Sequence, residues 1–144
     1  MPAAIHTIEF DAPPAAVMAV LVDFQTYPSF LPGMELAEVL NHHGDSWEVR
    51  FRLRLIRELG YTLRLVRDGD RGLSWTLIEG VFRSNEGGWT LQPLDAGART
   101  RATYRIDVAV GVYVPGNIVR SLVEQSLPAT LSAFKAEIER RASN

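Results

Sequence analysis

The stretch Trp47–Leu55 reads WEVRFRLRL and alternates strictly between apolar and charged side chains. Its odd positions are all apolar, and its even positions carry Glu48 and three arginines. Because successive side chains of a β-strand point to opposite faces, this pattern is typical of a strand with one face on the core and one in water. We therefore expect an antiparallel sheet with a single apolar face.

The same two-residue period recurs in six further segments, which are Ile5–Phe10, Glu35–Leu40, Tyr61–Val66, Leu73–Ile78, Trp89–Leu94 and Thr100–Val110. Short turn sequences separate the later strands, at His43–Asp45, Asp68–Asp70, Glu86–Gly88 and Asp95–Gly97. Connections this short join only antiparallel neighbours, so the sequence predicts a meander with a hairpin turn at Gly87–Gly88.

A helical period appears between the first two strands. Asp11 precedes two prolines, which predicts a helix start with Asp11 as the capping residue. Apolar residues follow at helical spacing up to Phe24, and Pro28 then ends or interrupts the helix. We expect a short second helix or a turn over Tyr27–Gly33.

The helical period returns after Pro115–Asn117. An apolar stripe runs almost to the C-terminus through Ile118, Leu122, Leu127, Leu131, Phe134 and Ile138. Pro128 lies within this stripe and predicts a kink, because proline has no N–H to donate and its ring crowds the preceding turn.

Composition excludes several kinds of chemistry. The 144 residues include no Cys and three His, which excludes disulfides, thiolate metal sites and thiol nucleophiles and argues against a histidine-rich metal centre. No apolar run reaches the ~20 residues of a membrane span, and the first residues lack the pattern of a signal peptide. We expect a cytoplasmic protein without stable membrane insertion. A net charge of −2 argues against DNA as a partner.

Four motifs, in order along the chain, support a family resemblance. They are Asp11–Pro13, Asp23–Phe24 with Tyr27–Gly33, Glu79–Phe82 and Gly87–Trp89. With these motifs the chain resembles the START-like helix-grip superfamily (SRPBCC, birch-pollen-allergen-like) over nearly its whole length. Within it, the chain resembles the polyketide cyclase/dehydrase branch, which includes the coenzyme-Q-binding proteins and the ribosome-association toxin family.

The resemblance implies an α+β helix-grip fold, as one domain over residues 1–144. In that fold a seven-stranded curved antiparallel sheet wraps around a long C-terminal helix, and two short helices lie between strands 1 and 2. A helix laid across a curved sheet stands off from it in places, and such a gap can hold an apolar ligand.

We accordingly predict that the chain binds or carries a hydrophobic small molecule, such as a lipid, an isoprenoid quinone or a polyketide-like compound. The candidate ligand-binding residues are Tyr27, Phe30, Leu31, Phe51, Leu53, Tyr61, Leu63, Trp75, Phe82, Trp89, Tyr104, Ile106, Val123, Leu127, Leu131 and Phe134. If the sheet and the helix enclose no cavity, these same residues form a dry, filled core. Tyr27, Phe30 and Leu31 would form an entrance lid, and the hydroxyls of Tyr61 and Tyr104 would orient a polar group. The face of Trp75 is ambiguous, because Glu79 shares its parity.

One alternative is a polyketide cyclase or dehydratase. It needs acid–base groups inside the cavity, and the sequence offers only Tyr61, Tyr104 and Glu79 for that role. No phosphate-binding glycine loop or nucleophile elbow occurs, so we predict no catalytic residue, no metal and no cofactor.

A second alternative is a ribosome-, RNA- or protein-binding module. It would use the outer sheet face, which carries Arg50, Arg52, Arg54, Arg64, Arg101 and Arg105. The simpler interpretation is a solvated face on which these arginines pair with Glu38, Glu48 and Asp107 across strands. The sequence leaves open whether the protein is a monomer or a homodimer.

Overall fold

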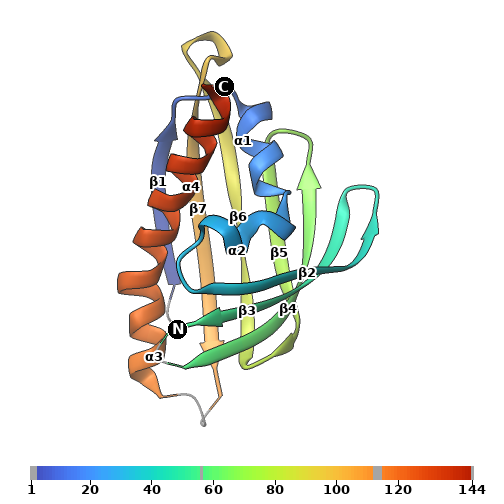
Figure 1. Ribbon diagram of the computed structural model, residues 1–144, viewed down its shortest axis with the longest axis vertical. Helices are drawn as coiled ribbons and strands as arrows, with labels where there is room; N and C mark the ends of the chain where they lie inside the picture. The colour runs from blue at the N-terminus through green and yellow to red at the C-terminus, as the bar shows by residue number, and fades with distance from the viewer. Residues whose placement is uncertain (1–2, 56, 112–114, 144) are drawn as a thin grey trace.

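The computed structural model describes residues 3–55, 57–111 and 115–143 and confirms the helix-grip fold (Figure 1). Its sheet consists of β1 (Ala3–Phe10), β2 (Met34–His43), β3 (Ser46–Arg54), β4 (Glu58–Asp68), β5 (Gly72–Gly80), β6 (Phe82–Leu94) and β7 (Arg99–Val110). The strand order is β1-β7-β6-β5-β4-β3-β2, and all neighbouring pairs are antiparallel. Between β1 and β2 lie α1 (Pro14–Leu21), a 3₁₀ turn (Phe24–Thr26) and α2 (Tyr27–Phe30).

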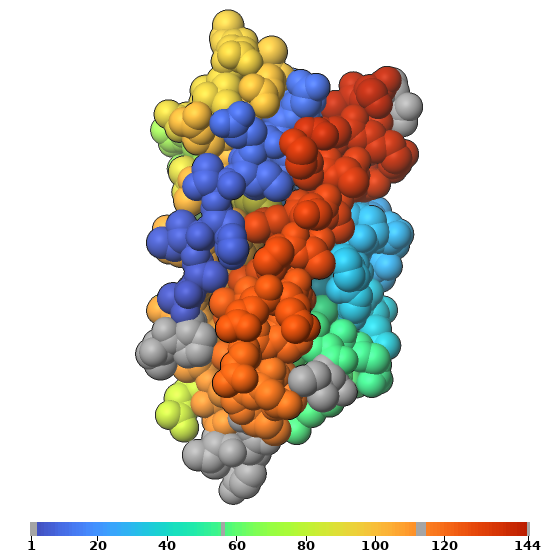
Figure 2. Space-filling model, turned by 90° about the vertical axis from the view of Figure 1, so that its left-hand side faces the viewer, coloured from blue at the N-terminus to red at the C-terminus, as the bar shows by residue number. Residues whose placement is uncertain are grey.

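The C-terminal helix fills the concave side of the sheet. It comprises α3 (Gly116–Ser121), a π-helical turn (Leu122–Ser126) and α4 (Leu127–Ala142). Figure 2 shows it lying between β1, in blue, and the β2–β4 side of the sheet, in cyan and green. No helix in the described part of the chain is both long and apolar enough to cross a membrane.

The irregularity that Pro128 predicts takes the form of the π-helical turn. The Leu127 N–H donates to the Leu122 carbonyl, five residues back, and Pro128 follows with no N–H to continue the regular pattern. Leu122, Ser126 and Leu127 therefore face the sheet at a place where the helix is irregular.

A β-bulge settles the face of Trp75. Thr62 pairs with Glu79 and Leu63 pairs with Leu77, so one extra residue, Ile78, is inserted in β5. The insertion reverses the inward and outward parity of the residues after Ile78. Trp75 points into the core with 7% of its surface exposed, and Glu79 is exposed.

The predicted hairpin turn at Gly87–Gly88 is wrong. Both glycines lie within β6, and the chain reverses instead at Gly80–Phe82. A Cβ on Gly87 would lie 2.1 Å from the Arg105 carbonyl oxygen, and one on Gly88 would lie 2.8 Å from that of Leu73. Glycine is needed here because the neighbouring backbones approach too closely for a side chain.

The capping role expected of Asp11 is also wrong. Helix α1 begins with Pro13 at its N-cap and has no side-chain cap. Instead, the Asp11 N–H donates to Glu139 Oε2 of α4, at 2.8 Å. Lys135 Nζ donates to the Glu9 carbonyl, and Arg141 pairs with Asp23 at 3.1 Å. These polar contacts attach the last turns of α4 to β1 and to the segment after α1.

The first half of the helix differs in this respect from the last turns. In the described part of the chain, residues 115–130 make no side-chain hydrogen bond or ion pair. Ile118, Val119 and Leu122 are buried there, so among the described residues apolar packing holds that half against the sheet.

Replacing Glu137 tests the ion pairs within α4 that hold Arg141, the partner of Asp23. Hydrogen bonds from Arg140 and Arg141 lower the pKa of Glu137 from 4.5 to about 2. Its charged form therefore stabilises the fold above pH 4.5, and this contribution is lost as the pH falls through about 2. We expect Glu137→Gln to lower the free energy of unfolding by about 1 kcal/mol at neutral pH. This difference from wild type should disappear as the pH falls to about 2, the pKa of Glu137 in the folded protein.

Urea unfolding across this pH range measures the effect. Glu124→Gln is the matched control, because Glu124 is exposed on the same helix and makes no ion pair among the described residues. A difference between wild type and Glu137→Gln that does not depend on pH would contradict the assignment.

Candidate functional site

A cavity of about 110 Å³ lies between the concave face of the sheet and the C-terminal helix. Its walls come from β2–β7, from α2 and the segment after it, and from the helix between Leu122 and Phe134. An apolar cavity of about 150 Å³ is large enough to bind benzene. At about 110 Å³ this space is smaller, so a single ring is the largest group that it takes up without a large movement of the walls.

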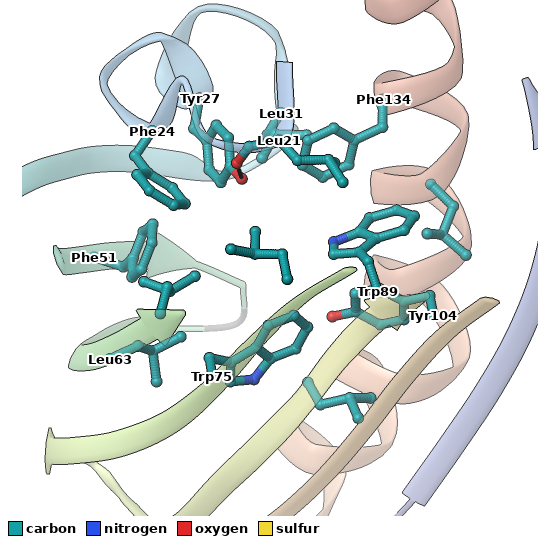
Figure 3. Close-up of a cluster of buried hydrophobic side chains, with 14 of the residues drawn as sticks. Leu21, Phe24, Tyr27, Leu31, Phe51, Leu63, Trp75, Trp89, Tyr104 and Phe134 are labelled. Atoms are coloured by element: carbon teal, nitrogen blue, oxygen red, sulfur yellow. Dashed lines mark hydrogen bonds between the residues drawn. The ribbon is translucent and has the colours of Figure 1, made fainter. Parts of the chain in front are cut away.

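Aromatic side chains form much of the wall (Figure 3). The Phe134 ring meets the rings of Tyr27 and Trp89 edge-on, with centroids 5.3 and 5.4 Å apart. Tyr104 packs against Trp89 at 4.9 Å and against Trp75 at 5.6 Å. Tilted and edge-on contacts of this kind are favourable and stabilise the arrangement of the rings.

The structure brings most of the predicted wall together. Tyr27, Leu31, Phe51, Leu53, Tyr61, Leu63, Trp75, Phe82, Trp89, Tyr104, Ile106, Leu127 and Phe134 all line the cavity. The other three candidates, Phe30, Val123 and Leu131, do not line it. Leu131 is buried in the core beside it, and Phe30 and Val123 are half-buried. Helical spacing identifies a buried stripe but does not show which of its members meet a void.

Several lining residues were not predicted, namely Pro32, Met34, Leu65, Leu73, Asn85, Leu122, Ser126 and Thr130. Asn85 is the most informative, because it is polar and only 5% exposed. Its neighbours Arg83, Ser84 and Glu86 make the segment read as a polar connection. A signal was nevertheless present, since Asn85 shares its parity with Trp89.

The three lining tyrosines differ in what their hydroxyls do. The Tyr27 hydroxyl donates to the Leu21 carbonyl, and its ring packs on Phe24 and Phe51. Tyr27 is therefore a fixed part of the wall, which does not fit the predicted entrance lid. The hydroxyls of Tyr61 and Tyr104 make no hydrogen bond to any described residue. Burial raises the pKa of all three, so they stay protonated at neutral pH.

No side chain that lines the cavity in the described part of the chain carries a charge. Glu79, the carboxylate that a cyclase would need, lies on the exposed face of the sheet and not in this wall. Among the described residues, no three His, Asp or Glu side chains come together to hold a metal ion.

The arginines of the outer face are mostly paired. Arg50 meets Glu38 at 3.2 Å, Arg54 meets Glu35 at 3.0 Å, and Arg64 meets Glu48 at 3.7 Å. Other pairs join Arg52 with Glu35 and Arg101 with Glu9. Asp107 was expected to take part but makes no ion pair with any described residue, and neither does Arg105. Paired arginines have less charge to offer an RNA backbone, which supports the solvated face.

Comparison of the sequence with protein-family models finds one family that matches most of the chain. Residues 10–135 match the model of the family described as polyketide cyclase/dehydrase and lipid transport. The chain belongs to the polyketide cyclase/dehydrase family. No curated protein sequence matches the chain at a significant level.

Several solved structures have the same fold as this member of the polyketide cyclase/dehydrase family. The ZhuI aromatase/cyclase from Streptomyces sp. R1128 superposes with a TM-score of 0.86 at 24% identity, covering 97% of this chain and 94% of that one. A START superfamily protein from Mycobacterium smegmatis gives 0.83 at 21% identity, covering 96% and 98%. A STAR-related lipid transfer protein from Xanthomonas axonopodis gives 0.72 at 19%, covering 94% and 85%.

Tyrosine-to-phenylalanine variants test the assignment of the hydroxyls in this family member. We expect Tyr27→Phe to lower the free energy of unfolding by about 1–2 kcal/mol, because the Leu21 carbonyl loses its donor. Tyr61→Phe and Tyr104→Phe should stay within about 0.5 kcal/mol of wild type, since no hydrogen bond is lost. Chemical denaturation of the three variants measures this. Equal losses in all three would show that the hydroxyls have equivalent roles.

Proposed function

We propose that this protein binds a neutral, apolar small molecule in the cavity between its sheet and its C-terminal helix. A lipid, an isoprenoid quinone or a polyketide-like compound is the class of ligand. The observation that carries the proposal is a cavity walled by aromatic and aliphatic side chains, with a few polar groups and no charged side chain among the described residues. Binding would remove the ligand's apolar surface from water, at about 25 cal/mol per Å².

The absence of charge from this wall narrows the ligand class. A carboxylate or phosphate moved into such a cavity would lose its hydration and meet no cationic side chain of the described wall, which is strongly unfavourable. A ligand with an ionised head group would therefore keep that group outside the wall.

The size of the cavity implies movement during binding. About 110 Å³ is below the roughly 300–1,000 Å³ of most ligand sites, so a molecule with several rings or a long chain needs the walls to separate. The first half of the C-terminal helix is the part to move. It is held by apolar contacts, and it contains the π-helical turn that contributes Leu122 and Ser126 to the wall.

A cyclase or dehydratase activity is the second candidate, supported by the structural similarity to an aromatase/cyclase. The raised pKa values of Tyr61 and Tyr104 make their hydroxyls hydrogen-bond donors at neutral pH and poor bases. These residues would polarise a substrate carbonyl but would not remove a proton. Ligand binding alone asks less of the side chains present, so it is the function we favour.

Filling the cavity tests the proposal. Leu63 lines the wall, and Leu63→Trp would place an indole in the space. We expect fluorobenzene to bind wild type saturably, as followed by ¹⁹F NMR, and binding to be lost in Leu63→Trp. Thermal unfolding should show that the variant remains folded. We expect overpacking to lower its free energy of unfolding by about 1–3 kcal/mol.

Val123→Phe is the matched control, because Val123 lies on the same helix as several wall residues but does not line the cavity. This variant should bind fluorobenzene as wild type does. No saturable binding to wild type, or equal binding to Leu63→Trp, would overturn the proposed function.

A further inference from the structure

Asn85 is a buried amide in the wall of an otherwise apolar cavity. It lies on β6 opposite Val108, and 5% of its surface is exposed. A buried amide that lacks hydrogen-bond partners costs about 1–3 kcal/mol, so its contacts define what it can do. The Asn85 side chain has one acceptor oxygen and one NH₂ group with two donors.

Trp75 fixes the orientation of that amide. The indole Nε1 of Trp75 lies 3.1 Å from Oδ1 of Asn85. An indole nitrogen can only donate, so the amide atom facing it must be the oxygen. The Nδ2 group therefore points away from Trp75, and in the described part of the chain it donates to no acceptor.

The indole N–H of Trp89 is a second donor without a hydrogen-bond partner among the described residues. Trp89 is buried on the same strand, and its Nε1 makes no hydrogen bond to a described residue. Figure 3 shows its indole nitrogen and the Tyr104 hydroxyl directed toward the side of the cluster where Trp75 and Phe51 lie. Some polar groups of the cluster can act in only one role. Two of them are Asn85 Nδ2 and Trp89 Nε1, and both are donors.

We propose that Asn85, oriented by Trp75, binds a carbonyl-type oxygen of the ligand and thereby sets the ligand's orientation in the cavity. This inference rests on the proposed binding function. A carbonyl oxygen only accepts, so it matches a fixed donor. A tyrosine hydroxyl discriminates less, because it rotates and can donate or accept. Asn85 is thus the specificity-determining residue, and Trp75 is its positioning residue.

Three probes with the same ring separate the contributions. Acetophenone carries a carbonyl, ethylbenzene replaces it with a methylene, and benzoate carries a negative charge. We expect acetophenone and ethylbenzene to bind wild type in NMR titrations that follow the Trp indole N–H signals. Benzoate should show no saturable binding, because no cationic side chain among the described residues lines the wall to pair with it.

The ratio of affinities for acetophenone and ethylbenzene isolates the hydrogen bond. In Asn85→Leu we expect this ratio to fall about fivefold, as expected for one neutral hydrogen bond. Comparing ratios removes the general effects of the substitution on the cavity, which both probes experience. Asn41→Leu is the matched control, because Asn41 is exposed on β2, and it should leave the ratio unchanged.

Infrared spectroscopy provides a measurement that needs no variant. The C=O stretch of acetophenone bound to wild type should lie at lower frequency than in hexane, because a donated hydrogen bond weakens the C=O bond. A stretch at the hexane value, or the same affinity ratio in wild type and Asn85→Leu, would overturn the role of Asn85 while leaving apolar binding intact. If neither acetophenone nor ethylbenzene binds wild type, the proposed function itself fails.

Discussion

A helix cannot remain in contact with a strongly curved sheet along its whole length, and this mismatch organises the rest of the structure. Where the two surfaces meet, at the end of α4, polar contacts from Lys135, Glu139 and Arg141 attach the helix. Where they separate, the aromatic rings meet edge-on and leave a cavity of about 110 Å³. The same helix is therefore fixed at one end and held by apolar contacts at the other, next to the π-helical turn.

Charged side chains are also distributed unevenly between the two faces of the sheet. The outer face of the sheet pairs its arginines with glutamates, as Arg50 does with Glu38 and Arg54 with Glu35. The concave face has no charged group in its cavity wall among the described residues. The small net charge of −2 thus combines a surface of paired ions with an interior of uncharged donors. The first arrangement favours solvation and the second favours a neutral ligand.

Strict alternation along β3 was enough to predict the sheet and the inward position of residues such as Phe51, because each side chain's face follows from strand geometry. Local irregularities were not predictable in this way. The bulge at Ile78 places Glu79 on the opposite face from the one that simple counting gives. Gly87 resembles a turn residue but is needed for a close backbone contact with β7. Asn85 sits in a polar stretch, where its parity with Trp89 is the one sign in the sequence that it faces the core.

The central claim is that the space between helix and sheet is an apolar cavity open to small neutral molecules. The most direct measurement is a crystal structure of the protein under xenon pressure, because xenon enters apolar cavities. We predict xenon density between Trp75, Trp89 and Phe134. Density absent from that position, with side chains filling the space, would contradict the account.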